Sequence, residues 1–127
     1  MDHNQKGELT EAKFIVKILE LGWEVAAPIH HHKSYDYIIR RASTRSWETI
    51  QVKTAYPDIR RGINGKLMVG FRRSRRLGSN RQTYKDGDFD FLFVGYEGQC
   101  WMIPWIEVRD NKSSIEVGSA KYDNWRI

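Results

Sequence analysis

Four polar side chains have the types and the spacing that metal-assisted hydrolysis of a phosphodiester requires: Glu11, Asp36, Gln51 and Lys53. Carboxylate and amide oxygens are hard ligands for a divalent cation, and a nearby ammonium stabilises the negative charge that develops on the phosphoryl oxygens. We therefore expect Glu11, Asp36 and the Gln51 amide oxygen to hold a cation and Lys53 to stabilise the transition state. For Gln51 and Lys53 taken alone, an ordinary solvent-facing strand is the alternative.

Two predicted strands carry three of these residues. Residues 35–39 and 49–54 form short apolar-flanked stretches, the first with Asp36 and the second with Gln51 and Lys53. Because side chains alternate along a strand, Gln51 and Lys53 share one face, and Ile50 and Val52 occupy the other. The polar row is thus predicted to point out of the core.

A predicted helix carries the fourth residue. Over residues 8–21 apolar side chains recur with a helical period, and Gly22 supplies a C-terminal stop. Glu8 precedes Glu11 by three residues and shares its face of the helix, so both can point toward one site. Glu8 is therefore an accessory candidate for the role of Glu11.

The other elements complete a mixed α/β pattern without internal repeats. The alternation and turn signals predict further strands over 23–27, 67–71, 89–96 and 100–103, whereas 104–127 fits either short strands or one helical turn. A chain of 127 residues is long enough for one compact core, so a single domain over 1–127 is expected.

Composition restricts the setting in which the protein acts. The single cysteine, Cys100, excludes an intramolecular disulfide and fits a reducing interior. No apolar run approaches the roughly 20 residues of a membrane helix, and the first residues lack a signal-peptide pattern. We expect a cytoplasmic protein without membrane contact, associated with the nucleoid when it is bound to DNA.

The positive charge is concentrated in one segment. The chain has 21 basic and 16 acidic residues, and nine of the basic ones lie within residues 60–85, where no acidic residue occurs. The rest has 12 basic and 16 acidic residues, a net charge of −4. Such a segment is typical of polyanion binding, although a solvated loop or a localisation signal would also fit. The nine residues are Arg60, Arg61, Lys66, Arg72, Arg73, Arg75, Arg76, Arg81 and Lys85.

Other polar and aromatic residues have less specific patterns. Tyr56 and Tyr84 are flanked by basic residues and are candidates for stacking on a nucleotide. The histidines at 30–32 would point to alternating faces of a strand, so a loop near DNA or a buried polar contact is favoured over a transition-metal site. Asp88 and Asp90 are expected to cap a turn and to begin a strand rather than to bind metal.

The order of these motifs resembles the PD-(D/E)XK nuclease superfamily. The resemblance rests on residues 6–12 of the first helix, on Tyr35-Asp36 and on residues 50–54, Ile-Gln-Val-Lys-Thr. The Gln-x-Lys form looks most like the group I intron homing endonucleases of bacterial origin, and archaeal Holliday-junction resolvases are relatives with the same core. The resemblance implies an α/β restriction-endonuclease-like core, with a mixed central sheet flanked by helices and a basic DNA-binding loop.

The same resemblance implies roles for individual residues. Asp36 would be the central metal-bridging carboxylate, Glu11 the helix-borne carboxylate, and the Val52 carbonyl would complete the shell of Mg²⁺ or Mn²⁺. Lys53 would position the attacking water or stabilise the pentacovalent phosphate. Gln51 stands where most members have Glu or Asp, so we expect weaker metal affinity, slower cleavage or an altered metal preference.

Three functions fit this pattern. The first is a site-specific homing-type endonuclease that cuts double-stranded DNA as a homodimer or homotetramer, because one active site cuts one strand. The second is a structure-selective junction resolvase, and the third is a nucleic-acid-binding protein with weak or lost turnover. Unpaired carboxylates beside a phosphate backbone repel it, which argues against the third.

Overall fold

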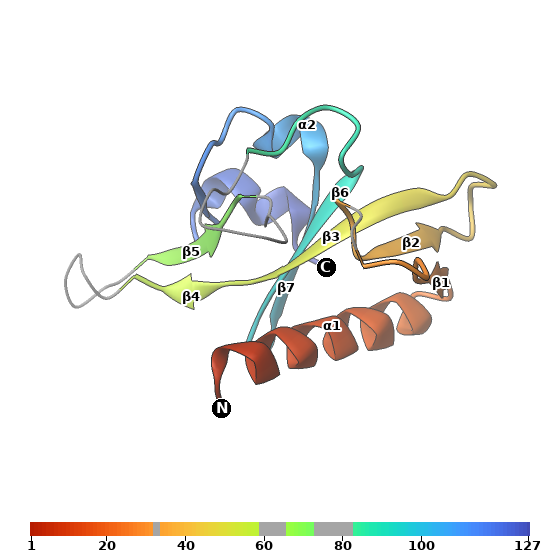
Figure 1. The fold of residues 1–127 in the computed structure, drawn as a ribbon, viewed down its shortest axis with the longest axis horizontal. Coiled ribbons are helices and arrows are strands. Elements are labelled where there is room, and N and C mark those ends of the chain that lie inside the picture. The colour runs from red at the N-terminus through yellow and green to blue at the C-terminus, as the bar shows by residue number, and fades with distance from the viewer. Residues whose placement is uncertain (32–33, 59–65, 73–82) are drawn as a thin grey trace.

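A five-stranded mixed sheet carries the candidate site residues. The computed structural model describes residues 1–31, 34–58, 66–72 and 83–127. The strand order is β1-β2-β3-β6-β7; β3 and β6 run parallel, and the other neighbours run antiparallel. Helix α1 lies along one side of this sheet (Figure 1). These elements are α1 (His3–Glu20), β1 (Glu24–Ala26), β2 (Tyr37–Arg40), β3 (Glu48–Thr54), β6 (Phe91–Tyr96) and β7 (Gln99–Pro104).

A second, smaller sheet adjoins the first, with strand order β4-β5-β8. Only Ala55 separates β3 from β4, so one length of chain passes from the large sheet into the small one (Figure 1). The segment after 104, for which the sequence left two possibilities, supplies both a strand and short helical turns. The additional elements are β4 (Tyr56–Pro57), β5 (Leu67–Gly70), α2 (Trp105–Val108), β8 (Ser114–Glu116) and the 3₁₀ helix η2 (Ala120–Trp125).

Helix α1 begins five residues earlier than the apolar period predicted. The Asp2 side chain accepts a hydrogen bond from the Gln5 N–H at 2.8 Å, and the Gln5 side chain accepts one from the Asp2 N–H at 2.9 Å. This reciprocal capping box satisfies two backbone donors that a helix start otherwise leaves without a partner. The predicted start at residue 8 was wrong because the first turn contributes no side chain to the core.

Two apolar clusters lie on the two faces of the large sheet. Phe14 and Ile18 of α1 are fully buried against Ile50 and Val52 of β3, which confirms the predicted alternation along that strand. On the other face, Trp101 is fully buried among residues from both sheets and from the C-terminal segment. An apolar cluster therefore packs on each face of the sheet, and the polar residues Gln51 and Lys53 of β3 lie beyond the stretch that pairs with β2.

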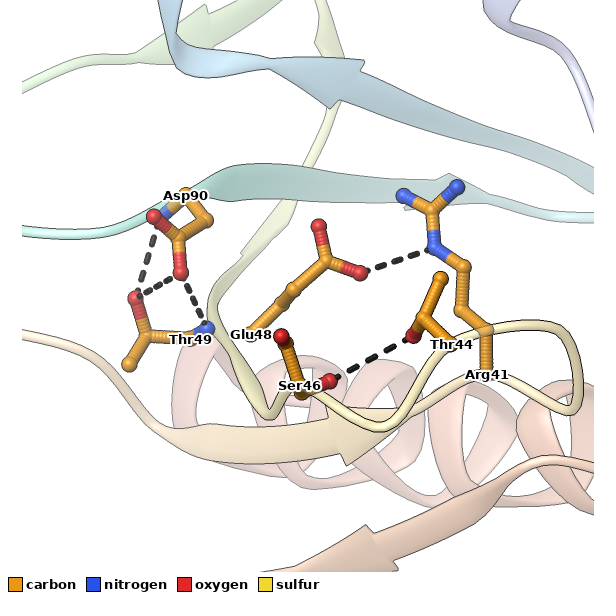
Figure 2. Close-up of polar contacts among 6 residues, drawn as sticks. All are labelled: Arg41, Thr44, Ser46, Glu48, Thr49 and Asp90. Carbon is orange, nitrogen blue, oxygen red and sulfur yellow. Dashed lines mark hydrogen bonds and ion pairs between the residues drawn. The ribbon is translucent and has the colours of Figure 1, made fainter.

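Figure 2 shows polar contacts around the start of β3, including those between Thr49 and Asp90, the residue before β6. The Asp90 carboxylate accepts from the Thr49 N–H at 2.8 Å, and the Thr49 hydroxyl accepts from the Asp90 N–H at 3.0 Å. Asp88 accepts from the Lys85 N–H at 2.9 Å and closes the preceding turn. Both aspartates thus have the structural roles expected of them.

No helix in the described part of the chain is long and apolar enough to cross a membrane.

Gly95 allows α1 to pack closely on β6. A Cβ atom at Gly95 would lie 2.9 Å from Thr10 Cγ2, and the Thr10 hydroxyl is held 2.6 Å from that of Thr54. We expect Gly95→Ala to lower the free energy of unfolding by about 1–3 kcal/mol, the usual cost of overpacking. Urea denaturation tests this. Thr10→Ser removes Cγ2 and should rescue the variant, whereas Gly7→Ala, which meets nothing within 4 Å, should not destabilise.

Candidate active site

Backbone pairing of β2 with β3 fixes the position of Asp36. Its N–H donates to the Ile50 carbonyl at 2.8 Å, and its Oδ2 accepts from the Val52 N–H at 2.8 Å. Oδ2 also accepts from Gln51 Nε2 at 2.9 Å. The predicted partners Asp36 and Gln51 are therefore in contact, although 15 residues separate them in sequence.

The Gln51 amide nitrogen lies between two oxygens. Nε2 is 2.9 Å from Asp36 Oδ2 and 3.5 Å from the Val52 carbonyl oxygen. Both oxygens thus converge on one point, which a partly positive NH₂ group occupies. The sequence-based expectation was that the amide oxygen faces this point. A half-turn about the last side-chain bond exchanges nitrogen and oxygen, and it would present Oε1 instead.

Glu11 approaches the same region from α1. It lines a cleft of about 100 Å³ together with Asp36, and its Oε1 accepts from the Tyr37 hydroxyl at 3.1 Å. The cleft brings together a helix, the start of β2 and the segment before it. Its lining residues are Glu11, Ala27, Pro28, His30, His31, Tyr35, Asp36 and Tyr37.

Both carboxyl groups are held in surroundings that disfavour their charge. Burial raises the pKa of Glu11, and the charge of Asp36 raises it further. Burial also raises the pKa of Asp36, although the Val52 N–H and the Lys53 ammonium act in the opposite direction. Two partly desolvated carboxylates that repel each other form an arrangement that a cation stabilises.

Tyr37 is a site residue that the motif comparison did not identify. It follows Asp36, so its side chain points to the opposite face of β2, toward α1, where it meets Glu11. Burial and the neighbouring Glu11 raise the pKa of Tyr37 to about 12, so the hydroxyl stays protonated and donates to Glu11. A tyrosine one position after the acidic residue is the only signal that the sequence offers for this contact.

Lys53 lies on the same face of β3 as Gln51 and is half-buried. Its charge lowers the pKa of Asp36, and its Nζ lies 5.7 Å from the centre of the Tyr84 ring. The Lys53 ammonium is therefore near Asp36, the carboxylate with which the sequence motif pairs it. Glu8 is exposed one turn before Glu11, and its charge contributes to the raised pKa of Glu11.

Tyr84 is a core residue in this fold. It is 7% exposed, and its ring packs against Phe71 and Phe89 with centroids 4.9 and 5.2 Å apart. Its burial leaves no ring face for stacking on a nucleotide, which corrects that expectation. Tyr56, the other candidate, is 44% exposed on β4.

Three of the nine basic residues that we predict to bind nucleic acid lie in the described part of the chain. Lys66, Arg72 and Lys85 are exposed, and Lys66 Nζ lies 3.4 Å from a Glu116 carboxylate oxygen. Residues 64–65, Asn-Gly, which the sequence predicts to form a turn, and the other basic residues of this segment lie outside the described residues. Those basic residues are Arg60, Arg61, Arg73, Arg75, Arg76 and Arg81.

The donor set at the cleft suits a hard divalent cation. Within residues 1–31, 34–58, 66–72 and 83–127, no three His, Cys, Asp or Glu side chains gather as a metal cluster. The oxygens that converge on the Gln51 amide nitrogen are instead a carboxylate and a backbone carbonyl, and Glu11 lines the cleft together with Asp36. Oxygen donors of this kind fit Mg²⁺ better than a transition metal. His30 and His31 line the cleft, and His32 lies outside the described residues.

The fold and the site define a nuclease. The chain belongs to the PD-(D/E)XK endonuclease family, whose model matches residues 1–124. The structure of a bacterial homing endonuclease, I-Ssp6803I, matches 99% of this chain and 89% of that chain with a TM-score of 0.78 at 23% identity. Protein 5.3 of Escherichia phage T7 is 29% identical over 113 residues, 88% of this chain and 87% of the phage protein. The predicted family and fold class are confirmed.

Replacement of Gln51 by glutamate tests the consequence of a neutral amide at this position. Gln51→Glu removes the donor to Asp36 and brings two carboxylates together, so the metal-free protein should lose about 1–3 kcal/mol of unfolding free energy. Mg²⁺ affinity should rise about tenfold, because a charged ligand binds a cation more strongly. Calorimetric titration and urea denaturation in EDTA measure the two effects. Gln5→Glu, which keeps the helix cap, is the control; a parallel change there would contradict the assignment.

Proposed function

We propose that this nuclease is a metal-dependent endonuclease that hydrolyses phosphodiester bonds in double-stranded DNA at specific sites. The convergence of Asp36 Oδ2 and the Val52 carbonyl on one point, 2.9 and 3.5 Å from a single nitrogen, carries the proposal. Glu11 lines the same cleft, and Lys53 is near enough to lower the pKa of Asp36. The homing-endonuclease fold supports site-specific cleavage, and a junction resolvase remains an outcome of the test.

The catalytic roles follow from the positions of these groups. Asp36, Glu11 and the Val52 carbonyl would hold Mg²⁺ or Mn²⁺, joined by the Gln51 oxygen after its half-turn. Such an ion, when bound, lowers the pKa of its water and polarises the phosphoryl group. The Lys53 ammonium stabilises the charge that develops on the phosphoryl oxygens, since this contact strengthens as the charge grows. Tyr37 fixes the orientation of Glu11 through its hydrogen bond.

DNA would be bound beside the small sheet. Lys66 and Arg72 are exposed close to the two ends of β5, Lys85 is exposed before the turn that precedes β6, and Tyr56 presents a ring on β4. Lysines mainly contact phosphates, whereas arginines can also contact guanine edges in the major groove. Each chain has one site, so a double-strand break requires at least two copies, as a homodimer or homotetramer. Cytoplasmic location stays a prediction.

The decisive experiment compares the wild type with Asp36→Asn on supercoiled plasmid libraries, linear duplex and a synthetic four-way junction. Each substrate is incubated with Mg²⁺, Mn²⁺ or EDTA. Discrete metal-dependent products from the wild type alone would support the proposal, and preferential cutting of the junction would favour a resolvase. Tight binding without product under every metal would refute a cleavage function.

The acidic limb of the pH profile, where Mg²⁺ affinity falls as pH decreases, should depend on the pKa of Glu11. Metal binding needs deprotonated carboxylates, and burial raises the pKa of both Glu11 and Asp36, so affinity should fall at a higher pH than for ordinary carboxylates. Tyr37→Phe removes the hydrogen bond that lowers the pKa of Glu11 and should move this limb to higher pH. Calorimetric Mg²⁺ titration across pH measures it, with Tyr56→Phe as control. An unmoved limb would show that Tyr37 does not act through Glu11.

A further inference from the structure

Helix α1 has apolar side chains on two opposite sides. Phe14 and Ile18 point into the sheet and are fully buried. On the far side, Leu9, Val16 and Leu19 are 41%, 54% and 59% exposed. At about 100° per residue these three, together with the exposed Ala12, form one stripe along the helix.

The spacing of this stripe is that of a helix-pairing seam. Leu9, Ala12, Val16 and Leu19 are separated by three, four and three residues, the a/d pattern of helices that pack side by side. The helix has 18 residues, which corresponds to a length of about 27 Å. Scattered exposed apolar residues are common on protein surfaces, but an aligned row on a long helix indicates a docking surface.

We infer that this stripe, Leu9–Ala12–Val16–Leu19, pairs with the same stripe of a second copy of this chain in antiparallel orientation. Its order is self-complementary about a point midway between residues 12 and 16. An antiparallel partner would place its Leu19 against Leu9 and its Val16 against Ala12, so a large residue meets a small one at the centre. The same residues then form both sides of the interface, as two-fold symmetry requires.

The charges beside the stripe complement each other in the antiparallel orientation. Lys6 and Glu20 lie on one flank near opposite ends of α1, and both are exposed. Antiparallel pairing brings the same flank of the two helices together and places Glu20 of one copy toward Lys6 of the other at both ends. Lys13, on the same flank, donates to the Glu97 carbonyl of its own chain at 3.1 Å. This contact draws its charge away from the symmetry axis.

A second copy is also the occupant that the chemistry needs. This part of the argument rests on the proposed function, because cutting both DNA strands requires two active sites. Glu11 is on the same helix as the stripe but on a different side, so pairing through α1 leaves the cleft accessible. The interface itself is testable without any cleavage assay.

Sedimentation equilibrium tests the interface on the full-length protein. The wild type should have at least twice the 15.0 kDa mass of one chain. Val16→Glu should raise the dissociation constant of that assembly at least about tenfold, because it buries an unpaired charge at the seam. The matched control is Ile106→Glu on α2, a residue 67% exposed and remote from the stripe. Circular dichroism and thermal unfolding verify that both variants fold.

The charges provide an independent test of orientation. Lys6→Glu and Glu20→Lys should each weaken the assembly, and the double reversal should restore it. A monomeric wild type at about 1–50 μM, or identical association of Val16→Glu and wild type, would overturn the interface. An assembly that dissociates with Val16→Glu while no metal or DNA substrate gives cleavage would uphold the interface and refute the proposed function instead.

Discussion

Asp36→Asn is expected to abolish metal-dependent cleavage. The Asp36 Oδ2 is one of two oxygens that converge at the candidate cation position, and an amide contributes no negative charge there. Loss of such a ligand should reduce the cleavage rate roughly 1,000-fold or more. Single-turnover cleavage of supercoiled plasmid measures the effect. Asp110→Asn, an exposed change outside the cleft, should cleave like the wild type.

The same substitution should make the metal-free protein more stable. Burial raises the folded-state pKa of Asp36 above its unfolded value, so the native state binds this proton more tightly than the unfolded state. The contribution of Asp36 is therefore favourable at low pH and is lost as pH rises through the raised pKa. A neutral Asn avoids that loss and can still accept from the Val52 N–H. Thermal unfolding in EDTA at neutral pH should show a higher Tm, and a lower Tm would contradict the assigned pKa direction.

Lys53→Met should reduce the cleavage rate about 100- to 1,000-fold, the usual loss when one group that stabilises developing charge is removed. Mg²⁺ affinity should not decrease, because the substitution removes a positive charge beside Asp36. DNA affinity, measured in EDTA by anisotropy, should change far less than the rate, since one phosphate contact among many is lost.

Two comparisons separate a catalytic from a structural role for Lys53. Lys112→Met is a matched change of an exposed lysine and should cleave at the wild-type rate. Lys53→Arg keeps the charge and should recover part of the activity if the charge is the essential property. Wild-type cleavage by Lys53→Met would assign charge stabilisation to another cation.

The large sheet and α1 could be predicted because their residues repeat with a clear period. Ile50 and Val52 alternate with Gln51 and Lys53, and the structure places the first pair in the core. The small sheet could not be predicted, because β4 and β8 are two and three residues long and show no period. Its pairing of Val69 with Ile115 joins segments that are distant in the chain. Such contacts depend on packing rather than local sequence.

The site was predictable as a set of residue types, but not in its hydrogen bonding. The contact between Asp36 and Gln51 follows from the register that pairs Tyr37 with Ile50, and register is set by the whole sheet. The direction of the Gln51 amide depends on neighbours less than 4 Å away. Tyr37 was missed because its role depends on where α1 crosses β2. Motif spacing carries no information about that crossing.

Helix α1 has consequences for how this sequence can change over generations. One side packs on the sheet through Phe14 and Ile18, another presents Glu11 to the cleft, and the stripe occupies much of the remainder. On the proposed assignments, substitutions at these three sets of positions would affect stability, chemistry and assembly respectively. The small sheet is joined to β3 at Ala55 and contributes none of the four motif side chains. With DNA bound beside the small sheet as we propose, target preference could diverge there while the proposed catalytic residues stay constant, which would let related enzymes acquire new DNA sites.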